Sequence, residues 1–103
     1  MRTVRFIVED DTIMKDLDSN WLNLKNEDSV FAQFSFSKDW DGFVKVAGFE
    51  RSNVEFTPKV LMYGYMCEIP KEAFDGTFFR LYVIGKNGSK RKKTRDIIIN
   101  LNA

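Results

Sequence analysis

Short stretches in which apolar and polar residues alternate recur along the whole chain, separated by turn residues. The clearest covers residues 29–37, where apolar side chains occupy every second position. Because successive side chains of a β-strand point to opposite faces, this period of two predicts a strand with one buried side. Residues 78–85 carry the same pattern. The expected inward side chains of the two strands are Val30, Ala32, Phe34, Phe36, Phe79, Leu81 and Val83.

Weaker stretches of the same kind predict the other strands. They cover residues 3–8, 12–15, 43–50, 54–60, 61–69 and 97–101. Pro58 suits an edge strand because proline has no N–H for a further strand partner, and Asn87-Gly88 predicts a tight type I′ hairpin turn. The only helical signal runs from Pro70 to Phe74, since proline is favoured at the first helical position. Residues 21–24 fit either a short strand or a loop that plugs the core.

A series of about seven or eight short strands with turn signals between them is typical of an all-β fold. We predict one domain over residues 1–103, folded as a single antiparallel β-sandwich (Ig-like) or a flattened barrel with one short helical turn. A chain of 103 residues is too short for two independent cores. The sequence offers no long helices, which argues against a parallel α/β sheet.

The composition removes much of the chemistry that enzymes use. The chain has no histidine, so neither a Ser-His-Asp triad nor a Cys-His pair can be assembled. It also has no glycine motif of the nucleotide-binding kind. The single cysteine, Cys67, alternates with apolar residues, as a buried structural thiol does. A carboxylate pair for glycoside chemistry stays open, but nothing marks one. We therefore expect no enzymatic activity, no cofactor and no metal ion.

Charge and hydropathy set the expected surroundings of the protein. The net charge of +1 gives no overall field that would draw the chain onto nucleic acid. The N-terminal residues turn acidic at Glu9-Asp10-Asp11 before a signal peptide could form, and no apolar run is long enough to span a membrane. We expect cytoplasmic synthesis and no membrane partner.

The charge is nevertheless uneven, because residues 61–103 hold 8 basic and 4 acidic side chains. Most of this excess lies in one hairpin segment, whose cations are candidate partner-binding residues: Lys86, Lys90, Arg91, Lys92, Lys93 and Arg95. Such a cluster can contact an acidic protein face or phosphate. Alternatively, it is a solvated arm whose charges discourage edge-to-edge pairing. No aromatic residue interleaves the cluster, so bases find no stacking platform there.

The turn Asp39-Trp40-Asp41-Gly42 is a second candidate. It resembles a fragment of a calcium loop, to which Glu9-Asp10-Asp11 would add oxygen ligands if it folds nearby. One alternative is a structural turn whose carboxylates accept backbone N–H bonds while Trp40 covers a core edge. The other is an exposed Trp40 that anchors an interface.

The bend at Gly64 is a third candidate. Tyr63 and Tyr65 flank it, with Met62 and Met66 just outside. Tyrosine and methionine suit adaptable interfaces, and in a small sandwich they equally suit a cap on the core. We include Tyr63 and Tyr65 among the partner-binding candidates.

Three motifs follow one another between residues 34 and 94. The first, at residues 34–45, reads F-x-F-S-x-x-W-D-G-x-x-K, and the second, at residues 67–72, reads C-x-I-P-x-E. The third is the hairpin with Gly85, Asn87-Gly88 and Arg91 to Thr94. Their order resembles small proteins of tailed phages and prophages of Gram-positive bacteria. The resemblance does not extend to residues 1–28 or to the fully basic run Lys90 to Lys93.

This resemblance implies a phage-encoded β-sandwich that serves as a tail or baseplate accessory or assembly protein and binds another phage structural protein. It transfers no catalytic residues. Phages also make small proteins that inhibit host defence, anti-CRISPR proteins among them. On that alternative the chain binds a host Cas nuclease complex and blocks DNA binding or cleavage, with the basic hairpin on an acidic patch or at a nucleic-acid channel. Either reading makes the chain a protein-binding module of the host cytoplasm or the virion, of open oligomeric state.

Overall fold

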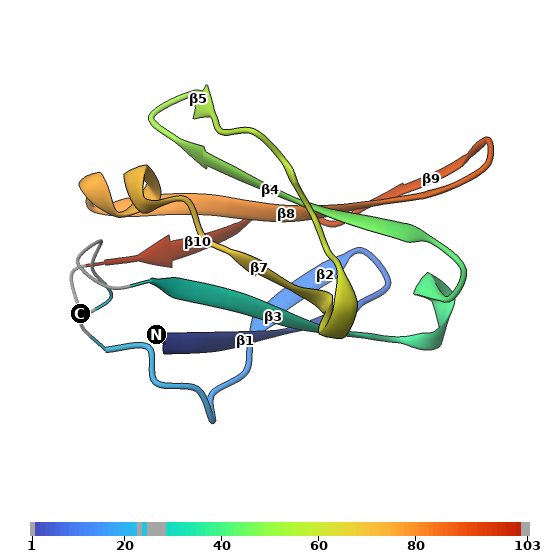
Figure 1. Ribbon diagram of the computed structural model, residues 1–103, viewed down its shortest axis with the longest axis horizontal. Helices are drawn as coiled ribbons and strands as arrows, with labels where there is room; N and C mark the ends of the chain where they lie inside the picture. Colours follow the sequence, from blue (N-terminus) through green and yellow to red (C-terminus); the bar gives the residue numbers. More distant parts are fainter. Residues whose placement is uncertain (1, 23, 25–28, 102–103) are drawn as a thin grey trace.

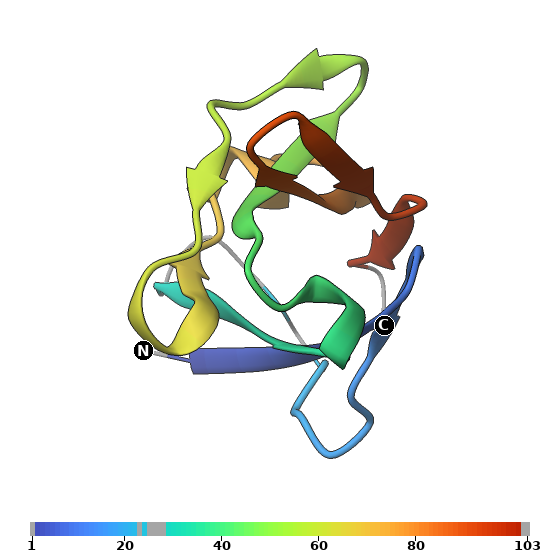
Figure 2. The same ribbon diagram turned by 90° about the vertical axis from the view of Figure 1, so that its right-hand side faces the viewer.

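The computed structural model describes residues 2–22, 24 and 29–101. Within them, two β-sheets lie face to face (Figure 1). The first sheet has the strand order β2-β1-β3-β7, and its strands are β1 (Arg2–Glu9), β2 (Thr12–Lys15), β3 (Val30–Phe36) and β7 (Met66–Glu68). Seen end-on in Figure 2, the second sheet lies over the first. One of the two sheets curls into a half-barrel.

The second sheet has the order β10-β8-β4-β5, with β6 also on β4 and β9 also on β8. Its strands are β4 (Val44–Arg51), β5 (Val54–Glu55), β6 (Lys59–Val60), β8 (Phe78–Asn87), β9 (Lys90–Lys93) and β10 (Ile97–Asn100). Short 3-10 helices complete the described part: η1 (Lys38–Trp40), η2 (Tyr63–Tyr65) and η3 (Lys71–Asp75).

The predicted all-β class and the two-sheet arrangement are confirmed. The prediction of a purely antiparallel sandwich is wrong in one place, because β1 and β3 run parallel, with Phe6 beside Phe34. In the sequence, β2 and a longer stretch of chain separate β1 from β3, as the crossover of a parallel pair requires. Residues 54–60 form the two short strands β5 and β6 on the edge of β4, which fits Pro58 between them.

Both sheets bury the side chains that the alternation assigns to the inside. Phe79, Leu81 and Val83 have no solvent exposure, and of the four expected from β3 only Phe36 is half-buried rather than buried. The rings of Phe6 and Phe34 stack at 5.2 Å between centroids, and Trp21 meets Phe6 edge-on at the same distance. Residues 21–22 form a loop rather than a strand. Because Trp21 packs from this loop, the plug alternative is the correct one.

The hairpin that joins β8 to β9 is where the sequence predicts it, shifted by one residue. Asn87 pairs with Lys90, so Gly88 and Ser89 make the two-residue turn, and Gly88 has φ 61°. Glycine at the first central position is the pattern of a type II′ turn, not type I′. We call residues 86–93 the basic arm. In Figure 1 this arm extends from the end of the molecule opposite the start of β1 and the end of β10.

β9 and β10 follow each other along the same edge of β8. Ile84 to Asn87 pair with β9, and Phe78 to Leu81 pair with β10. Between the two strands, buried Thr94 donates its backbone N–H to Val83 O and accepts the Val83 N–H on Oγ1, both at 2.9 Å. This double contact fixes the point at which β9 leaves the body of the sheet.

Candidate functional site

The turn at η1 is a core element that joins the two sheets. Trp40 has no exposed surface, its ring centroid lies 5.4 Å from Phe36, and its Nε1–H donates to Asp10 O at 2.9 Å. A fully buried ring cannot reach a partner, so the prediction of Trp40 as an interface anchor is wrong. The structural-turn alternative, with Trp40 packed into the core, is the one observed.

The carboxylates of the two acidic turns bind cations and a hydroxyl group of the protein itself. Asp39 Oδ2 accepts from Lys92 Nζ at 2.6 Å, and Asp39 Oδ1 accepts from Ser37 Oγ. The hydrogen bond from Lys92 is the largest cause that lowers the pKa of the Asp39 carboxyl below its usual value, and the hydrogen bond from Ser37 is the next largest. The turn of Asp10 and Asp11 does fold beside η1, and Asp11 pairs with Arg95 at 3.3 Å. No group of three His, Cys, Asp or Glu gathers anywhere in the described residues.

Lys92 is a docking residue of the arm rather than a free cation. Its Nζ lies 4.8 Å from the Trp40 ring centroid and also donates to Asp39 O at 2.8 Å. The side chain is therefore held against η1 on the inner side of the arm. Charge reversal at Lys92 would place two carboxylates together and disturb the fold, so this residue leaves the set of partner-binding candidates.

The other cations of the hairpin differ in their surroundings. Lys93 Nζ lies 4.5 Å from the Tyr82 ring centroid, and Arg95 pairs with Asp11 while remaining mostly exposed. Lys86, Lys90 and Arg91 are exposed. Among the ion pairs of residues 2–22, 24 and 29–101, none includes these three side chains.

The outer face of the second sheet brings the basic arm beside apolar side chains. In one row across the sheet, Val60 pairs with Val46, Val46 with Ile84, and Ile84 with Lys93. In the next row, Val44 pairs with Lys86, and Lys86 with Arg91. Because residues paired across strands share a face, both rows run from apolar to basic.

Met62 extends the second row at its apolar end. The hydrogen bond from Leu61 N to Lys45 O, 2.8 Å long, continues the β6 register and places Met62 opposite Val44. Val44, Val60 and Met62 are 60%, 51% and 70% exposed. We define the apolar–basic face as Val44, Val46, Val60, Met62, Ile84, Lys86, Arg91 and Lys93.

Sequence reasoning missed the apolar half of this face. Along residues 43–50 the period of two puts Ala47 and Phe49 on one side of the strand, and both are buried. The same period of two places Val44 and Val46 outward, where a strand normally carries polar residues. Two outward valines next to a basic arm were the available signal.

The bend at Gly64 contributes less to this face than expected. Tyr65 is partly exposed, but its ring meets Phe36 edge-on at 5.2 Å and lies 4.9 Å from Lys45 Nζ, so it caps the core. The side chain of Tyr63 lies outside the described part of the chain. Met62 is the residue of this segment that belongs to the apolar–basic face.

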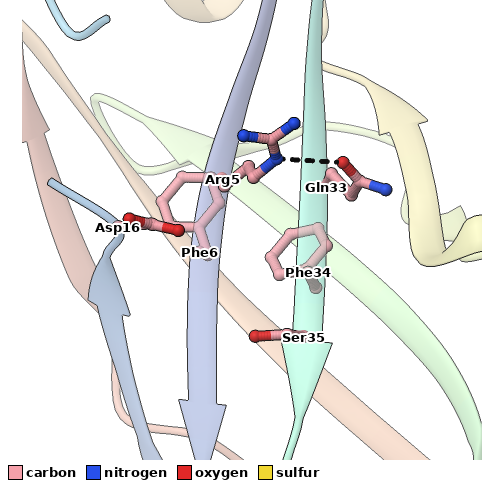
Figure 3. A pocket seen from close by; sticks show the side chains of 6 residues that line it. All are labelled: Arg5, Phe6, Asp16, Gln33, Phe34 and Ser35. Atoms are coloured by element: carbon pink, nitrogen blue, oxygen red, sulfur yellow. Dashed lines mark hydrogen bonds between the residues drawn. The ribbon is translucent and has the colours of Figure 1, made fainter. Parts of the chain in front are cut away.

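A pocket of about 350 Å³ lies on the first sheet and holds none of the predicted site residues (Figure 3). Three of its four polar side chains have partners within the protein: Arg5 Nε donates to Gln33 Oε1 at 3.3 Å, and Asp16 Oδ1 accepts from Asp18 N at 3.0 Å. The stacked rings of Phe6 and Phe34 also line it. Because these polar groups have partners within the protein, the pocket offers weaker recognition than the apolar–basic face.

Cys67 lies on β7 opposite Ala32 and is buried, as the alternation predicts. Burial raises the pKa of the Cys67 thiol to about 12, and the nearby charge of Lys59 opposes this only in part. At pH 8 we expect Ellman's reagent to modify Cys67 about 30-fold more slowly in the folded protein than in denaturant, because the thiolate fraction falls about 1000-fold while its nucleophilicity rises less. Equal rates in the two states would contradict a buried thiol.

The same shift has a consequence for stability. The unfolded thiol ionises near pH 9, whereas the folded thiol stays protonated up to about pH 12. Between these two pH values the unfolded state therefore binds fewer protons than the folded state. The free energy of unfolding falls as pH rises through this range.

Comparison with protein families, curated proteins and solved structures found no match. What the structure defines is an all-β protein of two packed sheets with a basic arm. In the part of the chain that is described, no helix is long and apolar enough to cross a membrane.

Proposed function

We propose that this chain is a non-catalytic, phage-encoded protein-binding module that holds its partner on the apolar–basic face. One observation carries the proposal: exposed apolar side chains lie in the same rows of the sheet as cations that have no carboxylate partner in the described residues. Exposed apolar patches next to polar groups are typical of protein interfaces. Lys86 opposite Arg91 is unfavourable in the isolated chain, and an acidic partner would relieve that repulsion.

The motif order in residues 34–94 supports a partner in the phage particle, so the chain would be a tail or baseplate accessory. A second candidate is an inhibitor of a host Cas nuclease. The feature that favours it is the placement of the cations on an arm at one end of the molecule (Figure 1). Such an arm complements the clustered carboxylates with which nucleases hold catalytic metal ions.

The test is a pull-down from phage-infected Gram-positive cells that express a CRISPR system, read by mass spectrometry. The bait is compared with a face variant, Val44→Ser/Val60→Ser/Met62→Ser. Because all three side chains are more than half exposed, the variant should fold, and we expect recovery of the partner to fall about tenfold or more. Leu17→Ser/Leu22→Ser removes exposed apolar side chains from the loop beyond β2 and serves as the matched control.

Each outcome separates the readings. Tail or baseplate proteins that are lost only with the face variant support the particle reading. A Cas nuclease lost in the same way supports the inhibitor reading. Equal recovery with the bait and both variants contradicts the apolar–basic face as the binding surface.

A further inference from the structure

The outer edge of β9 carries backbone groups that point away from β8. In an antiparallel pair, hydrogen-bonded and non-hydrogen-bonded residue pairs alternate. Thr94 is hydrogen-bonded to Val83, so the next hydrogen-bonded pairs are Lys92 with Gly85 and Lys90 with Asn87. The N–H and C=O groups of Arg91 and Lys93 therefore face the other side. Among the described strands, β9 pairs only with β8.

Arg95 shows what this edge binds inside the protein itself. Two residues after Lys93, Arg95 is the next residue whose backbone N–H points away from β8. This N–H donates to Asp11 O at 2.7 Å. Its guanidinium also pairs with the Asp11 carboxylate, Nε to Oδ2, at 3.3 Å. An acidic residue thus meets the edge through both its backbone and its side chain at position 95.

The side chains of the edge define what can continue this pattern. Arg91 and Lys93 lie on the outer face with Lys86 as their neighbour. A second copy of β9 would bring like charges together, which is how lysine-rich edges prevent self-pairing. An acidic strand meets the opposite situation, since its carboxylates would face three cations. The exposed part of this edge has no aromatic residue for base stacking, which favours a protein strand over nucleic acid.

We propose that β9 accepts an extended acidic segment of the partner as an additional antiparallel strand, with carboxylates at two positions, i and i+2, opposite Arg91 and Lys93. The inference rests on the proposed function and names the chemistry of the partner. Main-chain hydrogen bonds to a sheet edge supply affinity in such complexes, and alternate side chains supply specificity. Two acidic residues of the partner would contact residues 93 and 91 as Asp11 contacts residue 95, through both the backbone and the side chain.

The probe is an eight-residue peptide that alternates glutamate with threonine, acetylated and amidated at its ends. We expect it to slow amide hydrogen exchange at Arg91 and Lys93 about tenfold or more at saturation, measured by NMR. A matched peptide with N-methylated glutamates keeps the charge but loses the N–H groups that face β9. It should bind about tenfold more weakly or worse.

The protein variants separate strand addition from general attraction between charges. Arg91→Glu/Lys93→Glu should weaken binding of the probe about tenfold or more, whereas Lys59→Glu/Lys71→Glu, which changes the net charge equally at exposed sites in β6 and η3, neither of which pairs with β9, should change it little. If the probe binds without slowing exchange at Arg91 and Lys93, or if the N-methylated peptide binds equally well, strand addition is wrong. A probe that does not bind, or that an oligothymidylate of equal charge displaces from the same amides, also overturns the inference.

These outcomes are independent of the pull-down. A partner lost with the face variant while the probe leaves β9 unchanged would retain the proposed function and remove the acidic strand. If the probe protects Arg91 and Lys93 from exchange but the face variant has no effect in the pull-down, the acidic strand on β9 would be retained and the apolar–basic face would be removed as the binding surface.

Discussion

Replacement of Trp40 by alanine is expected to lower the free energy of unfolding by about 3–5 kcal/mol. The indole is fully buried, and it packs against Phe36 and Phe43 at centroid distances of 5.4 and 6.4 Å. Its loss would leave a cavity where the two sheets meet at η1. It would also leave Asp10 O without its donor and remove one of the rings beneath Lys92.

Urea denaturation followed by circular dichroism gives the change in free energy. Trp40→Phe is the matched variant, because it retains much of the apolar contact and loses the N–H donor. We expect it to cost clearly less than alanine. A loss below about 1 kcal/mol for Trp40→Ala would show that the turn contributes little to the core.

Gly85→Ala is expected to cost about 1–3 kcal/mol through overpacking. A Cβ at position 85 would lie 2.8 Å from Trp40 Cζ3 and 3.2 Å from Phe43 Cδ2. Because Trp40 is enclosed on all sides, its ring cannot move aside without displacing η1. The substitution therefore presses on the contact that docks the basic arm against the turn.

Two comparisons test this explanation by the same urea titration. Gly76→Ala meets only the flexible side chain of Arg51, at 3.3 Å, so we expect it to change the free energy of unfolding by less than about 0.5 kcal/mol. In a Trp40→Phe background the smaller ring leaves room for the added methyl group, so Gly85→Ala should cost less there. Equal costs in both backgrounds would rule out the clash with Trp40.

The sequence predicted the strands well because alternation depends on local burial. Every second residue from Val30 to Phe36 and from Phe79 to Val83 lies inward, as the period of two requires. Which strand pairs with which depends on tertiary packing, so the parallel pairing of β1 with β3 had no sequence signal. The same packing decides whether another strand covers the outer edge of β9, so the sequence did not reveal that edge either.

Individual polar and aromatic residues were harder to place. Lys45 shares the inward side of β4 and is buried, with Nζ donating to Phe43 O at 2.8 Å and lying 5.2 Å from the Phe36 ring centroid. A lysine can be buried in this way only where rings and a carbonyl happen to converge, and composition does not reveal that. For Trp40, the sequence left both a place at the core edge and an exposed interface anchor open, and the structure puts the ring inside, where the backbone carbonyl of Asp10 accepts from its one polar group.

The position of the basic arm also determines how the molecule would carry mechanical tension. The start of β1 and the end of β10 lie at one end of the molecule, and the turn between β8 and β9 lies at the other (Figure 1). Tension between the end of β10 and a strand seated on β9 would run through the backbone that continues from β9 into β10 along one edge of β8. The hydrogen bonds between β9 and the seated strand lie across this line, so they would be loaded together in shear rather than peeled apart in turn. The contacts of Lys92 with Asp39 and Trp40 would pass part of that load to the first sheet.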